Sequence, residues 1–263
     1  MEVITMSELV SDLARPRGRY GVDGDYRLIP APALFAGYLL LCLAEAALAA
    51  TWLAAGRTLA GAAVAVVAVA MVAVGVSILR FSRRGKFEVW ARLLTGIGLR
   101  GDEHVLDLGC GRGAVLLAAA KLVPRGKAVG VDIWRPDQTG NSMRATLANA
   151  DAEGVSDRVE LHTRDMTDLQ FPDASFDLVV SNLAIHNLPG NPARLAAIDE
   201  AVRVLRPGGR LVIADLGFTK LYARRLGQLG MANIGRKDLG WRAWWGLPFI
   251  RTHAVTATKP EPA

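Results

Sequence analysis

A glycine-rich turn preceded by a carboxylate is the part of the sequence best suited to binding a ligand. The run VLDLGCGRGA places Asp107 two positions before Gly109, and Cys110 and Gly111 follow. Glycine has no Cβ, so the backbone of such a turn can approach a ligand closely. Asp132 ends the next apolar run, where a carboxylate accepts hydrogen bonds from ribose hydroxyls. These residues predict a nucleotide-binding turn between a strand and a helix.

Two classes of cofactor fit this turn. The spacing of Gly109, Gly111 and Ala114 also satisfies the dinucleotide fingerprint, so an NAD(P)- or flavin-dependent oxidoreductase is one alternative. Asp107 favours the other class, because a carboxylate beside the first glycine attracts a cationic ligand and repels a pyrophosphate. Three further motifs follow in order along the chain: RDMTDLQF, FDLVVSNLAIHNL and VLRPGGRLVIAD.

With these four motifs in this order, residues 87–260 resemble the class I S-adenosylmethionine-dependent methyltransferases, in particular the ubiquinone/menaquinone-biosynthesis C-methyltransferases. The resemblance implies S-adenosylmethionine as the cofactor. It also implies a seven-stranded sheet with a reversed last hairpin, whose final strand would be RTHAVTATKP. The substrate-side signature of the quinone subgroup is not recognisable, so the methyl acceptor stays open.

The same resemblance assigns cofactor contacts near the glycine turn. Asp107, Gly109 and Gly111 would border the methionine part of S-adenosylmethionine, with Cys110 in the same turn. Asp132 would bind the ribose. The alternative is that these are ordinary turn residues of an α/β fold.

Further cofactor contacts are implied beyond the turn. Ile133 would pack on the adenine, and Asp165 and Met166 would meet its amino edge and ring nitrogen. Asn182, at the end of FDLVVSN, would approach the methionine end. A place in the apolar core is the alternative for Ile133 and Met166.

His186 is the candidate catalytic residue. It follows the predicted strand 177–182, at the carboxyl edge of the sheet where open α/β folds bind ligands. An imidazole accepts a proton near neutral pH, so His186 is suited to act as a base. The alternative role is a hydrogen bond that fixes its own loop.

The polar segment 134–143 is a candidate lid over the cofactor. Asp137, Gln138 and Asn141 would line the substrate entrance. The alternative is a solvated loop in which Asn141 or Ser142 caps the following helix.

Short Val- and Ile-rich runs alternate with helical stretches after residue 100. This alternation is typical of a doubly wound α/β domain with a mostly parallel sheet covered on both faces. Strands are expected at HVLDLG, AVGVDI, RVELHT, DLVVSN and RLVIAD, and helices at about 112–122, 142–153 and 192–205.

Two apolar runs explain the mean hydropathy of +0.25. Residues 33–55 contain one charge, Glu45, and residues 58–79 contain none. Each has the roughly 20 residues that a helix needs to cross a bilayer. A transmembrane hairpin is therefore expected, rather than two buried core helices or a signal peptide. We divide the chain into a cytoplasmic segment 1–31, a hairpin 32–80, a connecting helix 81–100 and a methyltransferase domain 101–263.

Basic residues flank the hairpin on the side of both chain ends. By the positive-inside rule, both termini and the catalytic domain face the cytoplasm, at the cell membrane. Four arginines precede the first run and four basic residues follow the second: Arg15, Arg17, Arg19, Arg27, Arg80, Arg83, Arg84 and Lys86.

The residues of the hairpin also suggest how its helices pack against each other or against another subunit. Glu45 should face the second helix, another subunit or a polar cavity, because a carboxylate facing lipid is costly. Small residues four apart, at Gly61/Ala65 and Ala46/Ala50/Ala54, permit close helix contact, so a homo-oligomer assembled through the membrane is a hypothesis.

The C-terminal region is basic and rich in tryptophan. Residues 203–263 carry a net charge of +8, against −6 for residues 101–202 and +4 for residues 1–100. The segment WRAWWGLPF, 241–249, would lie at a bilayer interface or, alternatively, wall the substrate pocket.

Composition excludes several other functions. The acidic middle of the chain argues against a nucleic-acid-binding surface. Two cysteines and four scattered histidines predict no disulfide framework and no metal site. The sequence therefore predicts a membrane-anchored S-adenosylmethionine-dependent methyltransferase acting on a lipophilic or amphipathic small molecule. The alternatives are a membrane-tethered NAD(P)-dependent oxidoreductase and a non-catalytic cofactor-binding membrane scaffold.

Overall fold

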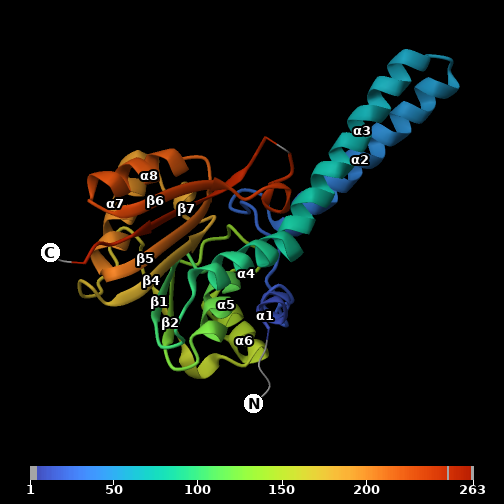
Figure 1. Ribbon diagram of the computed structural model, residues 1–263. Coiled ribbons are helices and arrows are strands. Elements are labelled where there is room, and N and C mark those ends of the chain that lie inside the picture. The colour runs from blue at the N-terminus through green and yellow to red at the C-terminus, as the bar shows by residue number, and fades with distance from the viewer. Residues whose placement is uncertain (1–4, 248, 262–263) are drawn as a thin grey trace.

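The computed structural model describes residues 5–247 and 249–261, and its centre is a seven-stranded sheet (Figure 1). The strand order is β3-β2-β1-β4-β5-β7-β6. All neighbours pair in parallel except β7, which is antiparallel to both β5 and β6. The strands are β1 His104–Leu108, β2 Lys127–Asp132, β3 Val159–Thr163, β4 Phe176–Asn182, β5 Leu205–Leu216, β6 Ala232–Asp238 and β7 Thr252–Thr258.

Helices cover both faces of the sheet, as predicted. On one face, α4 (Lys86–Ile97), α5 (Ala114–Leu122) and α6 (Met143–Glu153) pack through Trp90, Leu94 and Val115. On the other face, α7 (Gly190–Val204) and α8 (Thr219–Gln228) bury Ile198 and Tyr222. The doubly wound, mostly parallel fold and the reversed last strand are thus confirmed.

Predicted element boundaries are correct to within a few residues. A helix is expected from about residue 112, but α5 begins at Ala114. Gly113 has φ +86°, and this left-handed conformation belongs to the turn and not to the helix. Ser142 caps α6 by accepting a hydrogen bond from the Ala145 amide at 3.2 Å.

Two long apolar helices project from the domain as a rod (Figure 1). They are α2 (Ala31–Ala54) and α3 (Thr58–Arg80), and both are long and apolar enough to cross a membrane, judged by length and composition. Only 6% of the most apolar window of each helix is buried. The helix continues from α3 through a π-helical turn, Phe81–Gly85, into α4, so the rod and the domain share one uninterrupted helix.

The segment before the rod was not anticipated from the sequence. After α1 (Met6–Leu13), the chain runs across α6 towards the 134–143 loop. Glu153 of α6 holds it there by accepting hydrogen bonds from the Arg17 and Gly18 amides and from the Tyr20 hydroxyl at 2.7–2.9 Å. Lys121 balances the Glu153 charge at 2.8 Å.

Candidate active site

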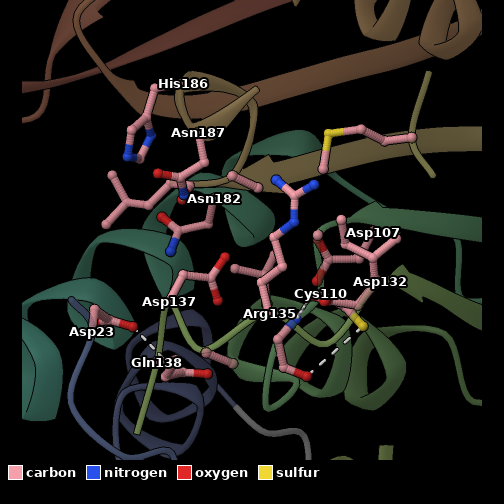
Figure 2. A pocket seen from close by; sticks show the side chains of 18 of the residues that line it. Asp23, Asp107, Cys110, Asp132, Arg135, Asp137, Gln138, Asn182, His186 and Asn187 are labelled. Carbon is pink, nitrogen blue, oxygen red and sulfur yellow. Dashed lines mark hydrogen bonds between the residues drawn. The ribbon is translucent and has the colours of Figure 1, made fainter. Parts of the chain in front are cut away.

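A single cavity at the carboxyl ends of the parallel strands gathers the predicted site residues (Figure 2). Strand β1 contributes Asp107, β2 contributes Asp132, and β4 contributes Asn182. Every candidate catalytic or cofactor-binding residue lines this cavity, namely Asp107, Gly109, Cys110, Gly111, Asp132, Ile133, Asp165, Met166, Asn182 and His186. The structure therefore brings together motifs that are spread over 80 residues of sequence.

The glycine turn is shaped by steric need. Gly109 has φ +70°, and a Cβ there would lie 2.4 Å from the Cβ of Ala184. Its amide and that of Cys110 both donate to the Val131 carbonyl, at 2.8 and 3.1 Å. These two amides are therefore engaged by the end of β2.

The next amides of the turn are also engaged. The Gly111 amide donates to Oδ2 of Asp132 at 2.8 Å, and the Arg112 amide donates to Oε1 of Gln138 at 3.0 Å. A pyrophosphate needs free amides at this helix N-terminus. The amides of residues 109–112 are thus not free to bind a pyrophosphate.

Asp107 is the most unusual side chain in the cavity. It is 2% exposed, and its Oδ1 has no hydrogen-bond partner among the described residues. Burial, reinforced by the nearby charge of Asp132 and opposed by the Leu116 amide, raises the pKa of Asp107 to about 8. A buried carboxylate oxygen without a donor is a site for a cationic or hydrogen-bond-donating ligand group.

Asp132 connects the turn to the loop that follows β2. It accepts from the Gly111 amide through Oδ2 and from the Trp134 amide through Oδ1, at 2.8 and 2.6 Å. Each carboxylate oxygen has a second lone pair, so ribose hydroxyls are still able to donate to it. Burial raises the pKa of Asp132, and it raises that of Asp137 to about 6 together with the charge of Asp132.

The cavity is also lined by the residues predicted to contact the adenine. Ile133 is 37% exposed there, and Met166 is half-buried beside Gly109, where a Cβ would lie 3.2 Å from the Met166 methyl carbon. Asp165 accepts hydrogen bonds from the Thr167 amide and hydroxyl at 2.8 Å. An exposed apolar side chain beside an exposed carboxylate is a suitable lining for a heteroaromatic ring with an amino edge.

His186 belongs to a buried hydrogen-bond network. Its Nδ1 lies 2.5 Å from Oδ1 of Asp215, and its backbone amide donates to Oδ2 of the same carboxylate at 3.0 Å. Asp215 is fully buried at the end of β5 and also accepts from the Tyr222 hydroxyl at 3.1 Å. With Nδ1 engaged by Asp215, Nε2 is the ring nitrogen left for the cavity that His186 lines.

Asp215 and Tyr222 were missed by sequence reasoning. Asp215 ends the run RLVIAD in the same way that Asp107 and Asp132 end theirs, which is the signal that was available. In a parallel sheet, the ends of β4 and β5 meet at the same edge, so a carboxylate at the end of β5 lies within reach of the loop after β4.

Asn182 and the 134–143 loop complete the wall. Oδ1 of Asn182 accepts from the Trp90 indole at 2.8 Å, which leaves its amide nitrogen for the cavity. Asp137 and Gln138 line the cavity as expected. Asn141 stays within the loop and donates to the Arg135 carbonyl at 2.9 Å, which corrects its predicted place at the entrance.

The N-terminal segment supplies a wall that no motif predicted. Asp23 lines the cavity and accepts from Nε2 of Gln138 at 2.8 Å (Figure 2). Lys86, whose side chain is 1% exposed, donates to both Asp23 oxygens at 2.9–3.0 Å. The Gly24 amide donates to the Asp137 carbonyl at 3.1 Å, so the segment pairs with the loop along the cavity rim.

In the segment 241–249 one tryptophan lies where the pocket-wall alternative predicted, and a place at a bilayer interface stays a prediction. Trp245 lines the cavity, whereas Trp241 is 52% exposed.

Comparison with known proteins finds similarity to methyltransferases. Residues 106–213 match the family described as methyltransferase domain. The chain is 35% identical over 133 residues to the demethylmenaquinone methyltransferase of Symbiobacterium thermophilum. It is 40% identical over 121 residues to the nocamycin O-methyltransferase of Saccharothrix syringae. These alignments cover 50% and 46% of this chain, and the chain spans only 50% and 40% of the lengths of these relatives.

Solved structures show the same fold. A S-adenosylmethionine-dependent methyltransferase from Aquifex aeolicus superposes with a TM-score of 0.51 at 20% identity. The superposition covers 64% of this chain and 88% of that protein.

Proposed function

We propose that this chain, which contains a class I S-adenosylmethionine-dependent methyltransferase domain, methylates a lipophilic or amphipathic small molecule at a membrane. The single observation that carries the proposal is Asp107, because a buried carboxyl group at the glycine turn, with one oxygen that has no hydrogen-bond donor among the described residues, suits a positively charged cofactor. A dinucleotide does not fit as well, since the turn amides are already engaged.

The cavity residues divide between the parts of S-adenosylmethionine. Asp107 would bind the ammonium of the methionine part, with the Gly109–Gly111 turn beside it and the Asn182 amide facing the same end. Asp132 would accept from the ribose hydroxyls, and Ile133 and Met166 would enclose the adenine beside Asp165. When bound, the cofactor supplies an electrophilic methyl group on a positively charged sulfur.

His186 would act at the acceptor. Asp215 holds the imidazole so that Nε2 is the nitrogen available to remove a proton from an acceptor hydroxyl or an acidic carbon. Much of the rate would come from holding the acceptor in line with the methyl group, which is a task for the cavity walls. Trp245, Leu216 and Leu183 are the apolar lining residues near His186 that would contact the acceptor.

The acceptor class is inferred from the rod and from the relatives. Large apolar side chains along α2 and α3 are exposed, such as Leu40 at 66% and Val69 at 69%, which favours a lipid environment for them. One relative is named for demethylmenaquinone, so lipophilic quinones are the first acceptors to test. The name of the other relative specifies O-methylation, and the acceptor atom is therefore left open.

The proposed topology places the domain and both chain ends in the cytoplasm. Exposed Arg83 and Arg84 lie at the domain end of the rod, whereas Arg57 is the basic residue at its tip. The hypothesis of a homo-oligomer rests on Ala46, Ala50 and Ala54, which are exposed along α2. Gly61 is instead buried within the hairpin, where a Cβ would lie 2.7 Å from Leu53. A monomeric mass in mild detergent would exclude the oligomer.

The deciding experiment uses the full chain in lipid nanodiscs with methyl-labelled S-adenosylmethionine and a total membrane lipid extract. We expect a labelled, organic-soluble product. S-adenosylhomocysteine should raise the thermal unfolding temperature, and NAD should not. Stabilisation by S-adenosylhomocysteine without any labelled product would support a non-catalytic scaffold, and stabilisation by NAD alone would support an oxidoreductase.

A further inference from the structure

The connection between β6 and β7 leaves the sheet and lies against the domain end of the rod (Figure 1). We call the described residues 239–247 and 249–251 the tryptophan loop. Its backbone touches α3 directly, because a Cβ added to Gly246 would lie 3.2 Å from Val74 and 3.3 Å from Ile78. The loop therefore extends along the last two turns of a helix that is itself a candidate membrane span.

Aromatic and cationic contacts hold the tryptophan loop on the rod. The Trp245 ring packs edge-on against Phe81 with the ring centroids 5.5 Å apart. The Arg80 guanidinium stacks 4.2 Å from the centre of the Trp241 ring. Arg242 pairs with Glu88 of α4 at 2.9 Å, so the loop contacts the helix on both sides of the π-helical turn.

The tip of the loop presents large apolar side chains to the outside. Phe249 is 74% exposed, Trp241 is 52% exposed and Ile250 is 36% exposed. The backbone beneath them is ordered by its own hydrogen bonds, including the Trp245 amide to the Ile250 carbonyl at 3.0 Å. A small ordered loop that exposes two large aromatic rings beside arginines has the composition of a membrane-interface anchor.

The same loop walls the active-site cavity. Trp245 lines the cavity together with Leu216 at the end of β5, while its neighbour Gly246 contacts α3. One face of the loop therefore borders the site and another borders the candidate span.

We infer that the tryptophan loop inserts Trp241, Phe249 and Ile250 into the cytoplasmic leaflet of the bilayer, so that the cavity opens beside Trp245 at the level of the lipid headgroups. The inference rests on the proposed membrane anchoring and adds the surface through which an acceptor passes from the leaflet into the site. Arg80 stacks on Trp241 of the loop, Arg83 and Arg84 are exposed in the helical turn that follows Arg80, and the positive charges of all three match anionic headgroups.

Lipid is the occupant that the contacts favour. The loop is continuous with the apolar surface of α3 through Val74 and Ile78, and any bilayer that surrounds α3 also reaches Gly246. At the boundary between acyl chains and headgroups, a tryptophan ring places its apolar body among the acyl chains and its polar N–H among the headgroups.

The test places an environment-sensitive fluorophore at single cysteines in the full chain. Cys42 is replaced by serine, and Cys110 is kept because burial raises the pKa of its thiol and makes it unreactive. The label is attached at Phe249→Cys in the loop, at Val69→Cys in the middle of α3, or at Leu147→Cys, an exposed apolar position on α6 that is 45% exposed. Nanodiscs contain phosphatidylcholine with phosphatidylglycerol, with or without brominated acyl chains.

We expect brominated lipid to quench most of the emission from positions 69 and 249 and to leave that of position 147 unchanged. Iodide in the buffer should quench position 147 alone. Quenching by bromine at position 69 but not at 249 would overturn the inference while leaving the membrane anchor intact. Protection of position 249 from both quenchers would overturn it too, because the loop would then be covered by protein, such as a second copy. Absence of bromine quenching at all three positions would contradict the anchor itself.

Discussion

The ammonium of Lys86 lies 2.9 Å from the carboxylate of Asp23, with only 1% of the lysine side chain and 15% of the aspartate side chain exposed. Along the chain, Asp23 precedes the two helices of the rod and Lys86 follows them, since Asp23 lies before α2 and Lys86 begins α4. Asp23 also accepts from Gln138 of the cavity loop. The pair therefore ties both ends of the hairpin to the rim of the candidate active site.

Replacing Asp23 should destabilise the domain. In Asp23→Asn the Lys86 ammonium stays buried without a counter-charge, and we expect a loss of about 3 kcal/mol in the free energy of unfolding. Asp25→Asn is the matched control, because its ion pair with Arg27 is more than half exposed and solvent screening leaves it little effect on stability. Urea unfolding in detergent measures both. Equal unfolding midpoints for the two variants would contradict a structural role for the Asp23–Lys86 pair.

Cofactor affinity should depend on pH through Asp107. Its pKa of about 8 would be lowered when the ammonium of the cofactor binds beside it. Below pH 8, binding must therefore release a proton, so the Kd for S-adenosylhomocysteine should rise by up to about tenfold per pH unit as the pH falls. Calorimetric titration between pH 6 and 9, a range that spans this pKa, measures how steeply the Kd changes with pH.

The control for this pH dependence is a ligand without the amino-acid part. Methylthioadenosine lacks the amino-acid part of the cofactor, so its affinity should stay flat where that of S-adenosylhomocysteine changes. Asp107→Asn should flatten the S-adenosylhomocysteine profile as well, because an amide does not titrate. If the Kd of Asp107→Asn for S-adenosylhomocysteine still depends on pH, the titrating group is another residue, such as Asp137.

Removing the imidazole should slow methyl transfer without releasing the cofactor. If His186 takes a proton from the acceptor, His186→Ala lowers kcat by about 10²- to 10⁴-fold while the Kd for S-adenosylhomocysteine is unchanged. Near-full turnover in this variant would remove His186 from the mechanism and leave it as a residue that fixes the loop.

Asp215 is a positioning residue that would act through His186. Asp215→Asn should lower kcat with little change in cofactor affinity, because the ring loses its charged partner at Nδ1. Tyr222→Phe is the milder comparison, since it removes one hydrogen bond to Asp215 and leaves the His186 contact in place. A similar kcat in all three proteins, with Asp215→Asn folded by circular dichroism, would contradict the orienting role.

Two glycines of the same helical segment should respond in opposite ways to alanine. A Cβ at Gly85 would lie 2.0 Å from the Arg242 carbonyl oxygen, so Gly85→Ala forces the tryptophan loop away from the rod and costs about 1–3 kcal/mol. Gly96 in α4 has open space around its Cβ position, and Gly96→Ala should stabilise by up to about 1 kcal/mol. Thermal unfolding of the two variants checks the sign of each change.

Residues that are close together in the sequence were predictable from local physics. The positions of β1, β2, β4 and β5 follow from short apolar runs, and the turn after β1 follows from glycines at positive φ, such as Gly109 at +70°. The carboxyl ends of parallel strands share one edge of the sheet, so the topology alone predicted that Asp107, Asp132 and His186 would lie near one another.

Contacts between distant parts of the chain were beyond the reach of the sequence. Nothing in the residues around Asp23 indicates that this carboxylate pairs with Lys86, 63 positions away, or that Gln138 completes the contact. The same holds for Asp215, which becomes the partner of His186 only because β5 lies beside β4. Such pairs depend on how the elements pack, and packing is not encoded in a local pattern.

By itself, the sequence determined the fold class, the glycine turn, the acidic character of the site and two apolar helices, because each depends on residue type and spacing within one segment. Only the tertiary structure decided that amides of the glycine turn are engaged, that Oδ1 of Asp107 is left without a donor among the described residues, and that Trp245 joins the cavity to the rod. Those features depend on burial and on the mutual approach of segments far apart in the chain, which are fixed when the domain packs.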